Sequence, residues 1–191
     1  MPSQARQRLL ATASDLFYRE GVRAVGIDRL IDESGVGKAS FYRHFSSKDD
    51  LVVEFLRARD QDWRAWLRDA VEREPEPARR PLAVFDALFE RFSRGDFRGC
   101  AFINTIAEVA HREHPAHVAA QGHKHAVGSY LRDLLAEAGI DDPDGLLASQ
   151  LLLLIDGAIV TAVREGSPDS ARAARQIAAA LLDAHPRTNP T

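Results

Sequence analysis

Apolar residues recur at intervals of three and four along almost the whole chain, which is the spacing of one buried face of an α-helix. No convincing stretch alternates apolar and polar residues as a half-buried strand does. Glycine interrupts the pattern at several places, including Gly21, Gly35, Gly139 and Gly166. The pattern therefore predicts an all-α fold with about nine helices.

Residues 27–45 have the pattern of a helix-turn-helix. A short apolar stripe at Ile27–Ile31 ends at Gly35, and Phe41 and Phe45 lie four positions apart on a second short segment. Gly35 suits the turn because glycine adopts a left-handed backbone conformation that other residues resist. We predict two short helices joined by a tight turn, the second held against the core by its phenylalanines.

The opposite face of that second helix carries groups that suit DNA. Its members are Lys38, Ala39, Ser40, Tyr42, Arg43 and His44. Short polar groups, a phenol and cations fit a major groove and its phosphates, and the small Ala39 lets the helix approach the bases. On these residues alone, a plain helical hairpin with a solvated polar face remains the alternative.

Residues 6–56 resemble the N-terminal domain of the TetR/AcrR transcriptional regulators. The matching features are Leu9-Leu10, Leu16-Phe17, Gly21, the Gly35-Val36 turn, Tyr42-x-His44-Phe45, Lys48 and Leu51. The resemblance implies a homodimer on double-stranded palindromic operator DNA, with repression relieved by a small molecule. We accordingly expect a helix-turn-helix DNA-binding domain over residues 1–47 and a helical ligand-binding and dimerisation domain over residues 48–191.

The resemblance also assigns roles to individual positions. It places Tyr42, His44 and Lys48 where the family clamps phosphates and Lys38, Ala39 and Ser40 where it reads bases, with Arg43 at a variable position. One departure is Gly26, where the family commonly has a threonine that caps the second helix and touches a phosphate. Because glycine has no hydroxyl, a DNA contact at Gly26 could come only from its backbone N–H.

The chain after about residue 50 is less specific. The stretch from Arg98 to Glu108 resembles the start of the sixth helix in one TetR subgroup. This resemblance does not identify a ligand. Most aromatic residues fall in the helices expected between residues 51 and 138, and Asn104 and Glu108 add polar groups to one face of an apolar helix. We expect a small, largely apolar effector bound by residues drawn from Trp63, Trp66, Phe89, Phe102, Asn104 and Glu108.

Two helices near the C-terminus carry more apolar and small residues than one core-facing stripe requires. They span about 143–165 and 168–185, and we expect the dimer to form through them. The apolar run Leu151–Val160 is broken by Asp156 and is shorter than a membrane span, so it predicts a buried helix. With no visible secretory signal, we expect a cytoplasmic protein.

Composition restricts the remaining function classes. The net charge is −3, so any nucleic-acid site must be a local patch. Without a glycine-rich phosphate loop, a nucleophile elbow or a paired metal motif, we expect no enzyme activity, no cofactor and no metal. A DNA-binding dimer without a ligand and a transcriptional activator remain open alternatives, as does a sensing role for Cys100 or for the histidines from His111 to His125.

Overall fold

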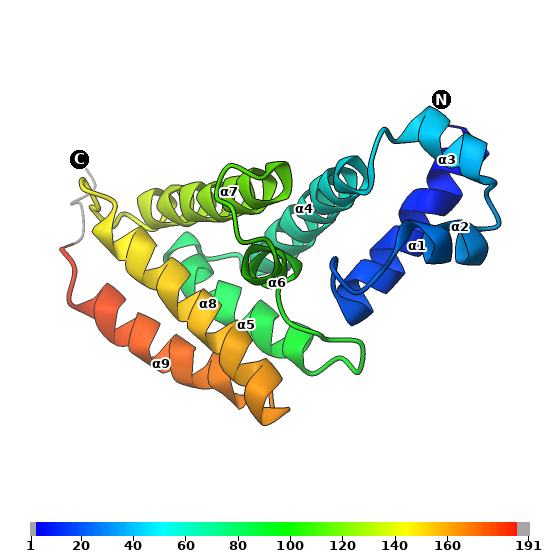
Figure 1. Cartoon of the computed structure of the whole chain (residues 1–191). Coiled ribbons are helices and arrows are strands. Elements are labelled where there is room, and N and C mark those ends of the chain that lie inside the picture. Colours follow the sequence, from blue (N-terminus) through cyan, green and yellow to red (C-terminus); the bar gives the residue numbers. More distant parts are fainter. Residues whose placement is uncertain (1–2, 187–191) are drawn as a thin grey trace. The chain divides into compact units, whose positions relative to one another are not determined.

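The computed structural model describes residues 3–186 and confirms the all-α prediction (Figure 1). Within residues 3–186, nine α-helices follow one another: α1 Gln4–Glu20, α2 Ile27–Ser34, α3 Lys38–His44, α4 Lys48–Glu72, α5 Arg80–Phe92, α6 Ala101–Glu108, α7 Pro115–Glu137, α8 Leu146–Glu165 and α9 Asp169–Asp183. A short 3-10 helix, η1 at Pro77–Arg79, precedes α5. No β-strand occurs in this described range.

The chain divides into two compact units. The first comprises residues 1–62 and 101–123, and the second comprises residues 63–100 and 124–191. Both α4 and α7 continue from one unit into the other, so each contributes to two cores. These two units are defined by packing. The domain boundary predicted between residues 47 and 48 instead divides the chain by function, and it stays a prediction.

In the first unit, α1 packs against α2, α3 and the first half of α4. Leu9, Leu16 and Phe41 are buried to 1% exposure or less, and the rings of Phe17 and Phe55 meet edge to face at 5.6 Å. Buried aromatic pairs of this geometry stabilise a core beyond the area that they remove from water. The helical stripe that the sequence places on α1 is therefore the face that holds the three-helix head together.

Two helix starts show how capping sets the boundaries. The hydroxyl of Ser47 accepts the Asp50 N–H at 3.1 Å and so caps the start of α4. At α8, the sequence predicts a helix from about residue 143, whereas the helix begins at Leu146. The Asp142 carboxylate reaches forward to accept the Leu147 N–H at 2.9 Å and the next N–H at 3.0 Å, so it caps a helix that begins later.

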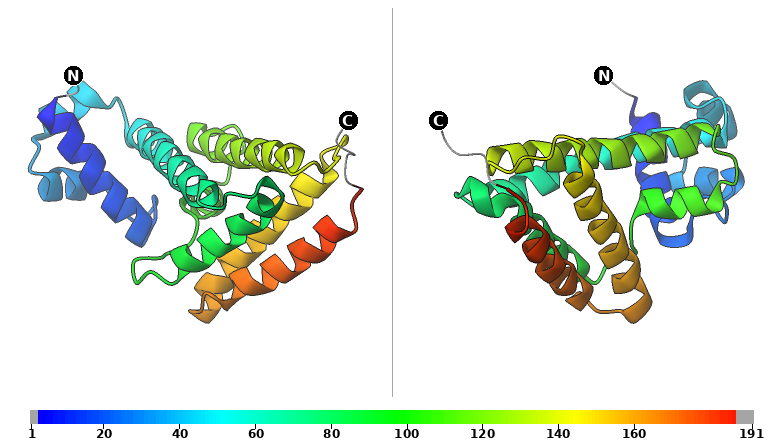
Figure 2. Two further views of the ribbon diagram at one scale, coloured as in Figure 1. Left: turned by 180° about the vertical axis from the view of Figure 1, so that it is seen from behind. Right: turned by 90° about the vertical axis from the view of Figure 1, so that its left-hand side faces the viewer.

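The second unit is built from α5, α8, α9 and the later halves of α4 and α7. Helices α8 and α9 run side by side (Figure 2), with the small Ala171, Ala174 and Ala178 of α9 buried in the shared core. Helix α8 is long and apolar enough to cross a membrane by length and composition. However, Leu147 and Leu151 are fully buried in this core, which is the behaviour of a core helix.

Candidate nucleic-acid interface

The turn between α2 and α3 has the geometry of a helix-turn-helix. Gly35 closes α2 in a left-handed conformation, with φ of 62° and ψ of 27°. The next N–H, that of Val36, bonds back to the Ile31 carbonyl at 3.3 Å. Val36 itself is only 3% exposed, and Gly37 precedes the first residue of α3. A side chain at position 35 would be strained in this conformation, which explains the glycine.

Helix α3 has one buried face and one exposed face. Phe41 and Phe45 are buried, with ring centroids 6.0 Å apart. Tyr42 rests edge-on against Phe41 at 5.2 Å and remains 49% exposed. Of the other residues predicted to meet DNA, Lys38, Ala39 and Arg43 are exposed, and Ser40 and His44 are half-buried. The structure thus gathers six of the eight predicted residues on one short helix.

Several of these side chains already have partners within the first unit. The imidazole Nε2 of His44 lies 3.0 Å from the hydroxyl of Ser3, which also accepts the Arg6 N–H and so caps α1. Lys38 Nζ is 3.8 Å from the Asp28 carboxylate, a loose and exposed pair. The contact with Ser3 holds the ring of His44 at the end of α3, whereas Lys38 is free to exchange its weak partner for a phosphate.

The last two predicted residues begin the neighbouring helices. Gly26 is exposed and is the N-cap of α2 without a side-chain hydrogen bond, as expected for glycine. Lys48 is the first residue of α4 and is half-buried. Burial lowers the pKa of the Lys48 ammonium, while the charges of Asp49 and Glu108 act in the opposite direction. The side chain of Lys48 thus lies at the start of α4, among the charges of Asp49, Glu108 and Arg23.

The guanidinium of Arg29, on α2, forms ion pairs with carboxylates. Its guanidinium bonds to both oxygens of Glu20, at 2.5 and 2.8 Å, and to Glu33 at 2.7 Å. These hydrogen bonds raise the pKa of Arg29 above its ordinary range and lower that of Glu20. Arg29 therefore fastens α2 to α1 and is not among the residues that we assign to DNA.

Glu108 has a role that sequence reasoning did not identify. Its carboxylate accepts the backbone N–H of Arg23 at 2.7 Å and lies directly over Gly21. A Cβ added to Gly21 would come within 2.6 Å of the Glu108 Oε1, and the backbone there has φ of 93° and ψ of 155°. Glu108 therefore braces the loop between α1 and α2. The contact joins residues 85 positions apart, so local patterns carry no signal for it.

A cleft of about 290 Å³ adjoins this brace within the first unit. It is lined by Val22, Arg23, Lys48, Asp49, Val52, Glu108, Val109, Ala110, His111, His114 and Ala116. Opposite charges meet in it, and His114 Nε2 lies 3.3 Å from the Asp49 carboxylate. Across residues 3–186, no group of three or more histidine, cysteine or acidic side chains is placed to hold a metal ion.

The six residues predicted to bind an effector are divided between the two units. Trp63, Trp66 and Phe89 belong to the second unit, whereas Phe102, Asn104 and Glu108 belong to the first. Phe102 is buried and stacks on the ring of His123 at 3.6 Å, Asn104 is exposed, and Glu108 serves the brace. In the second unit, Phe89 lies under the guanidinium of Arg172 at 3.9 Å.

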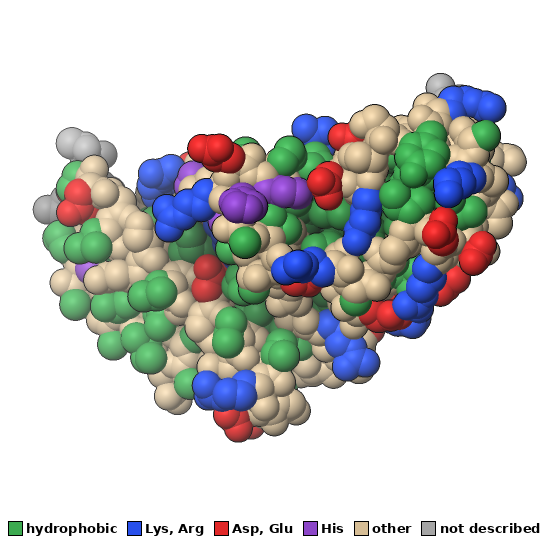
Figure 3. Space-filling model, viewed as in Figure 1, with side chains coloured by type: hydrophobic (Ala, Val, Ile, Leu, Met, Phe, Trp, Pro, Cys, Tyr) green, Lys and Arg blue, Asp and Glu red, His purple; other side chains and the backbone are tan. Residues whose placement is uncertain are grey.

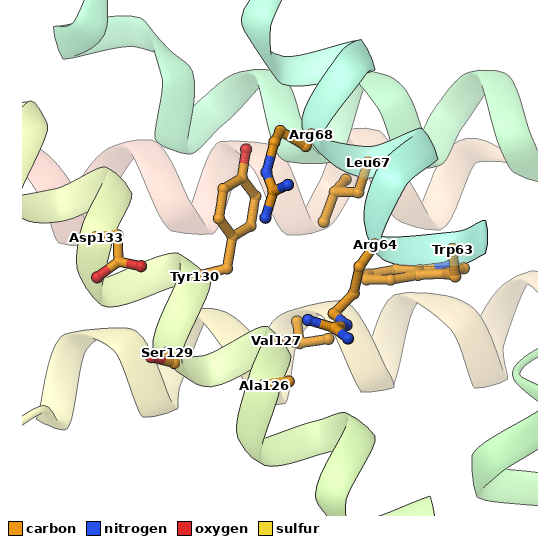
Figure 4. Close-up of a pocket in the computed structure, with 9 residues that line it drawn as sticks. All are labelled: Trp63, Arg64, Leu67, Arg68, Ala126, Val127, Ser129, Tyr130 and Asp133. Carbon is orange, nitrogen blue, oxygen red and sulfur yellow. The ribbon is translucent and has the colours of Figure 1, made fainter. Parts of the chain in front are cut away.

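One pocket in the second unit does contain a predicted residue. It has a volume of about 290 Å³ and lies between α4 and α7 (Figure 4). It is lined by Trp63, Arg64, Leu67, Arg68, Ala126, Val127, Ser129, Tyr130 and Asp133. Of these nine residues, the sequence pattern singles out Trp63 as a pocket residue but not the two arginines, because charged residues at helical spacing are usually a solvated face.

Comparisons with known proteins agree with this geometry. Residues 9–55 match the model of the bacterial regulatory proteins of the tetR family. A solved TetR-family transcriptional regulator from Streptomyces coelicolor is 36% identical, with a TM-score of 0.86 over 96% of this chain and 90% of that one.

Two curated relatives are named for opposite effects on transcription. The transcriptional activator FasR of Mycolicibacterium smegmatis is 32% identical over 52% of this chain and 45% of FasR. The transcriptional repressor KstR2 of Mycobacterium tuberculosis is 37% identical over 44% of this chain and 42% of KstR2. The alignments therefore span less than half of either relative. From its family match, its helix-turn-helix and its likeness to the Streptomyces protein along nearly its whole length, this chain belongs to the TetR family of DNA-binding transcriptional regulators.

Proposed function

We propose that this protein is a homodimeric repressor that leaves a palindromic operator when a small molecule binds. The observation that carries the DNA half of the proposal is the exposed face of α3, where a phenol, a hydroxyl and cations surround the small Ala39. Such a face fits the major groove, since base edges there offer hydrogen-bond partners and the flanking phosphates attract cations. The DNA lies in the cytoplasm of a bacterium, and we place the protein there.

The proposed contacts divide into two groups. Tyr42, His44 and Lys48 contact phosphates, and the backbone N–H of Gly26 adds a further donor. Lys38, Ala39 and Ser40 meet the base edges, and Arg43 lies beside them on the same exposed surface. Phosphate contacts set the affinity for any duplex, whereas base contacts set the preference for one sequence. Substitutions in the first group should therefore change the affinity for every duplex, whereas substitutions in the second should change the preferred sequence.

Apolar side chains exposed on α8 and α9 support a dimer. Leu146, Leu153 and Val160 repeat every seven residues along one side of α8, and they are 54%, 72% and 49% exposed. Val163 of α8 and Ile177 of α9 are each 52% exposed, and Figure 3 shows hydrophobic side chains gathered over these helices. Large exposed apolar patches commonly mark protein interfaces. Because two identical subunits present two identical α3 helices, we expect a palindromic site.

The DNA half is tested by selecting a binding duplex from a random pool and measuring affinities by fluorescence anisotropy. Tyr42→Phe and Lys48→Ala should weaken binding to every duplex, and Lys48→Ala should reduce the salt slope by about 1. Ser40→Ala should change the preferred bases. Arg57→Ala removes an exposed charge elsewhere on α4 and serves as the matched control. Equal binding of unrelated duplexes at physiological salt would contradict the proposal.

An activator is the second candidate, because FasR is named an activator. The same DNA contacts serve both outcomes, and the relatives compared are transcription regulators rather than enzymes. Transcript levels of the adjacent gene after deletion of this regulator separate the two. A rise supports the repressor, and a fall supports the activator.

A further inference from the structure

The hydroxyl of Ser3 lies between the start of α1 and the end of α3. It accepts the Arg6 backbone N–H at 3.2 Å, as an N-cap does, and it lies 3.0 Å from Nε2 of His44. These residues all belong to the first unit, although 41 positions separate the serine from the histidine. Among residues 3–186, no hydrogen-bond partner meets the other ring nitrogen of His44, Nδ1. Nδ1 is therefore available to a group outside the chain.

The chemistry of a phosphate contact decides which ring nitrogen of His44 must carry a proton. A neutral imidazole has one N–H, so only one of its two nitrogens donates and the other accepts. A phosphodiester oxygen accepts hydrogen bonds and has none to give, so the nitrogen that meets it must be the donor. With Nε2 turned toward Ser3, that donor is Nδ1, and Nε2 must accept. The serine hydroxyl supplies the proton that Nε2 needs, because a hydroxyl accepts one hydrogen bond and donates another.

The position of Ser3 at the N-terminus of α1 favours this direction of donation. If Nε2 of His44 carried the proton, the ring N–H and the Arg6 N–H would converge on one serine oxygen. The aligned peptide dipoles place partial positive charge at this end of α1, which disfavours a further N–H directed at that oxygen. In the opposite arrangement the Arg6 N–H donates to Ser3, and the Ser3 hydroxyl donates to His44. Hydrogen bonds in such a chain polarise and strengthen one another.

We infer that Ser3 is a positioning residue for DNA binding: its hydroxyl holds His44 in the tautomer that carries the proton on Nδ1. The hydrogen bond made by one ring nitrogen of a histidine sets the protonation of the other, so Ser3 prepares the ring to donate to a phosphate. The inference rests on the proposed function, from which it takes the phosphate contact of His44. Ser3 acts through His44 and is not itself assigned a contact with DNA.

The tautomer is measured on the full chain without DNA, by long-range proton–nitrogen NMR correlation of the imidazole rings at about pH 8.5, where an ordinary imidazole is neutral. His44→Ala identifies the signals of His44 among the seven histidines. We expect the proton on Nδ1 in wild type and in Ser3→Thr, which keeps the hydroxyl. Ser3→Gly should shift the proton toward Nε2, the nitrogen that an unconstrained histidine prefers. Glycine suits this test because it is itself an acceptable N-cap, so α1 loses little stability.

The affinity for the selected duplex measures the consequence for DNA binding. Ser3→Gly should weaken binding by about threefold to tenfold, the usual effect of one hydrogen bond, and Ser3→Thr should recover most of it. In the His44→Ala background, Ser3→Gly should cause no further loss, because Ser3 acts through that ring. Ser167→Gly is the matched control. The Ser167 hydroxyl also accepts an N–H at a helix start, that of Asp169 at 3.2 Å, but it lies in the second unit and donates to the Asp169 carboxylate.

The two measurements separate this inference from the proposed function. The inference is overturned if wild-type His44 carries its proton on Nε2, if Ser3→Gly leaves the tautomer unchanged, or if Ser3→Gly weakens binding equally with and without the His44 ring. It is also overturned if Ser3→Gly binds the duplex as tightly as wild type. If wild type binds no selected duplex, the proposed function falls, and the NMR spectra still decide whether Ser3 sets the tautomer. Circular dichroism melting checks that each variant is folded.

Discussion

The brace between Glu108 and Gly21 predicts an energetic coupling between two residues far apart in the sequence. Gly21→Ala places a methyl group where the Glu108 carboxylate lies, 2.6 Å from its Oε1. The backbone there has φ of 93° and ψ of 155°, a region that essentially only glycine occupies, so alanine costs about 2 kcal/mol in strain. Displacing the carboxylate also loses its hydrogen bond to Arg23, which is about 1 kcal/mol at this surface position.

These terms give a double-mutant cycle with a definite result. Gly21→Ala alone should lower the free energy of unfolding by about 3 kcal/mol, and Glu108→Ala alone by about 1 kcal/mol. In the Glu108→Ala background the carboxylate is already absent, so Gly21→Ala should cost only its strain, about 2 kcal/mol. The coupling between the two positions is then about 1 kcal/mol.

Urea unfolding followed by circular dichroism, at one protein concentration for all variants, measures the cycle. Gly166→Ala is the matched control, because Gly166 also has a positive φ, of 63°, but no atom lies within 4 Å of its added Cβ. Its cost should be the same with and without Glu108. If Gly21→Ala costs equally much in both backgrounds, the carboxylate does not occupy the space over Gly21 and the brace is refuted.

Three further predictions concern the surface and the caps. Leu153→Glu should convert the dimer to monomers in sedimentation velocity. The control Val118→Glu also places a charge at an exposed apolar position, but on α7, and should leave the dimer intact. A dimeric Leu153→Glu variant would refute the α8 interface. Arg29→Gln should raise the pKa of Glu20 toward its usual value in a carboxyl NMR titration, since Arg29 lowers it in the folded state. That pair stabilises the fold above the unfolded pKa of Glu20 and loses its effect as pH falls through the folded value, so an unchanged titration would show that the pair does not form in solution. Asp142→Ala should destabilise the chain by about 1–2 kcal/mol in urea unfolding because two N–H groups of α8 lose their acceptor, and an unchanged midpoint would exclude that cap.

The DNA-binding half could be predicted from the sequence because its determinants are local. The glycine at position 35 and the four-residue spacing of Phe41 and Phe45 together define a turn and an inward face, and the exposed face of α3 follows by exclusion. The start of α4 was equally accessible, because Ser47 and Asp50 meet within one helical turn. Interactions within a few residues leave a readable spacing.

The pocket between α4 and α7 could not be predicted because the residues that line it are distant in sequence. Helical periodicity shows that Arg64 and Arg68 share a face, but not that Tyr130 of α7 lies opposite them. The same limit explains Glu108. Its position on an apolar helix predicts a pocket residue, and Glu108 does line a cleft in the first unit. Its hydrogen bond to a backbone N–H 85 positions earlier has no counterpart in the local sequence pattern. Tertiary partners of single polar groups leave no periodic signal.

The position of Glu108 within its own helix has a consequence for the energy landscape of the protein. It is the last residue of α6, where the aligned peptide dipoles present partial negative charge and an added carboxylate is unfavourable by about 0.3–1 kcal/mol. The residue that braces the loop at Gly21 is thus a poor choice for its own helix, a conflict between local and global preferences of the kind called frustration. Natural sequences tend to retain such conflicts at positions that serve a function. Alanine at position 108 would therefore suit α6 taken alone better than glutamate does, and would suit the whole fold less well, because the brace would be lost.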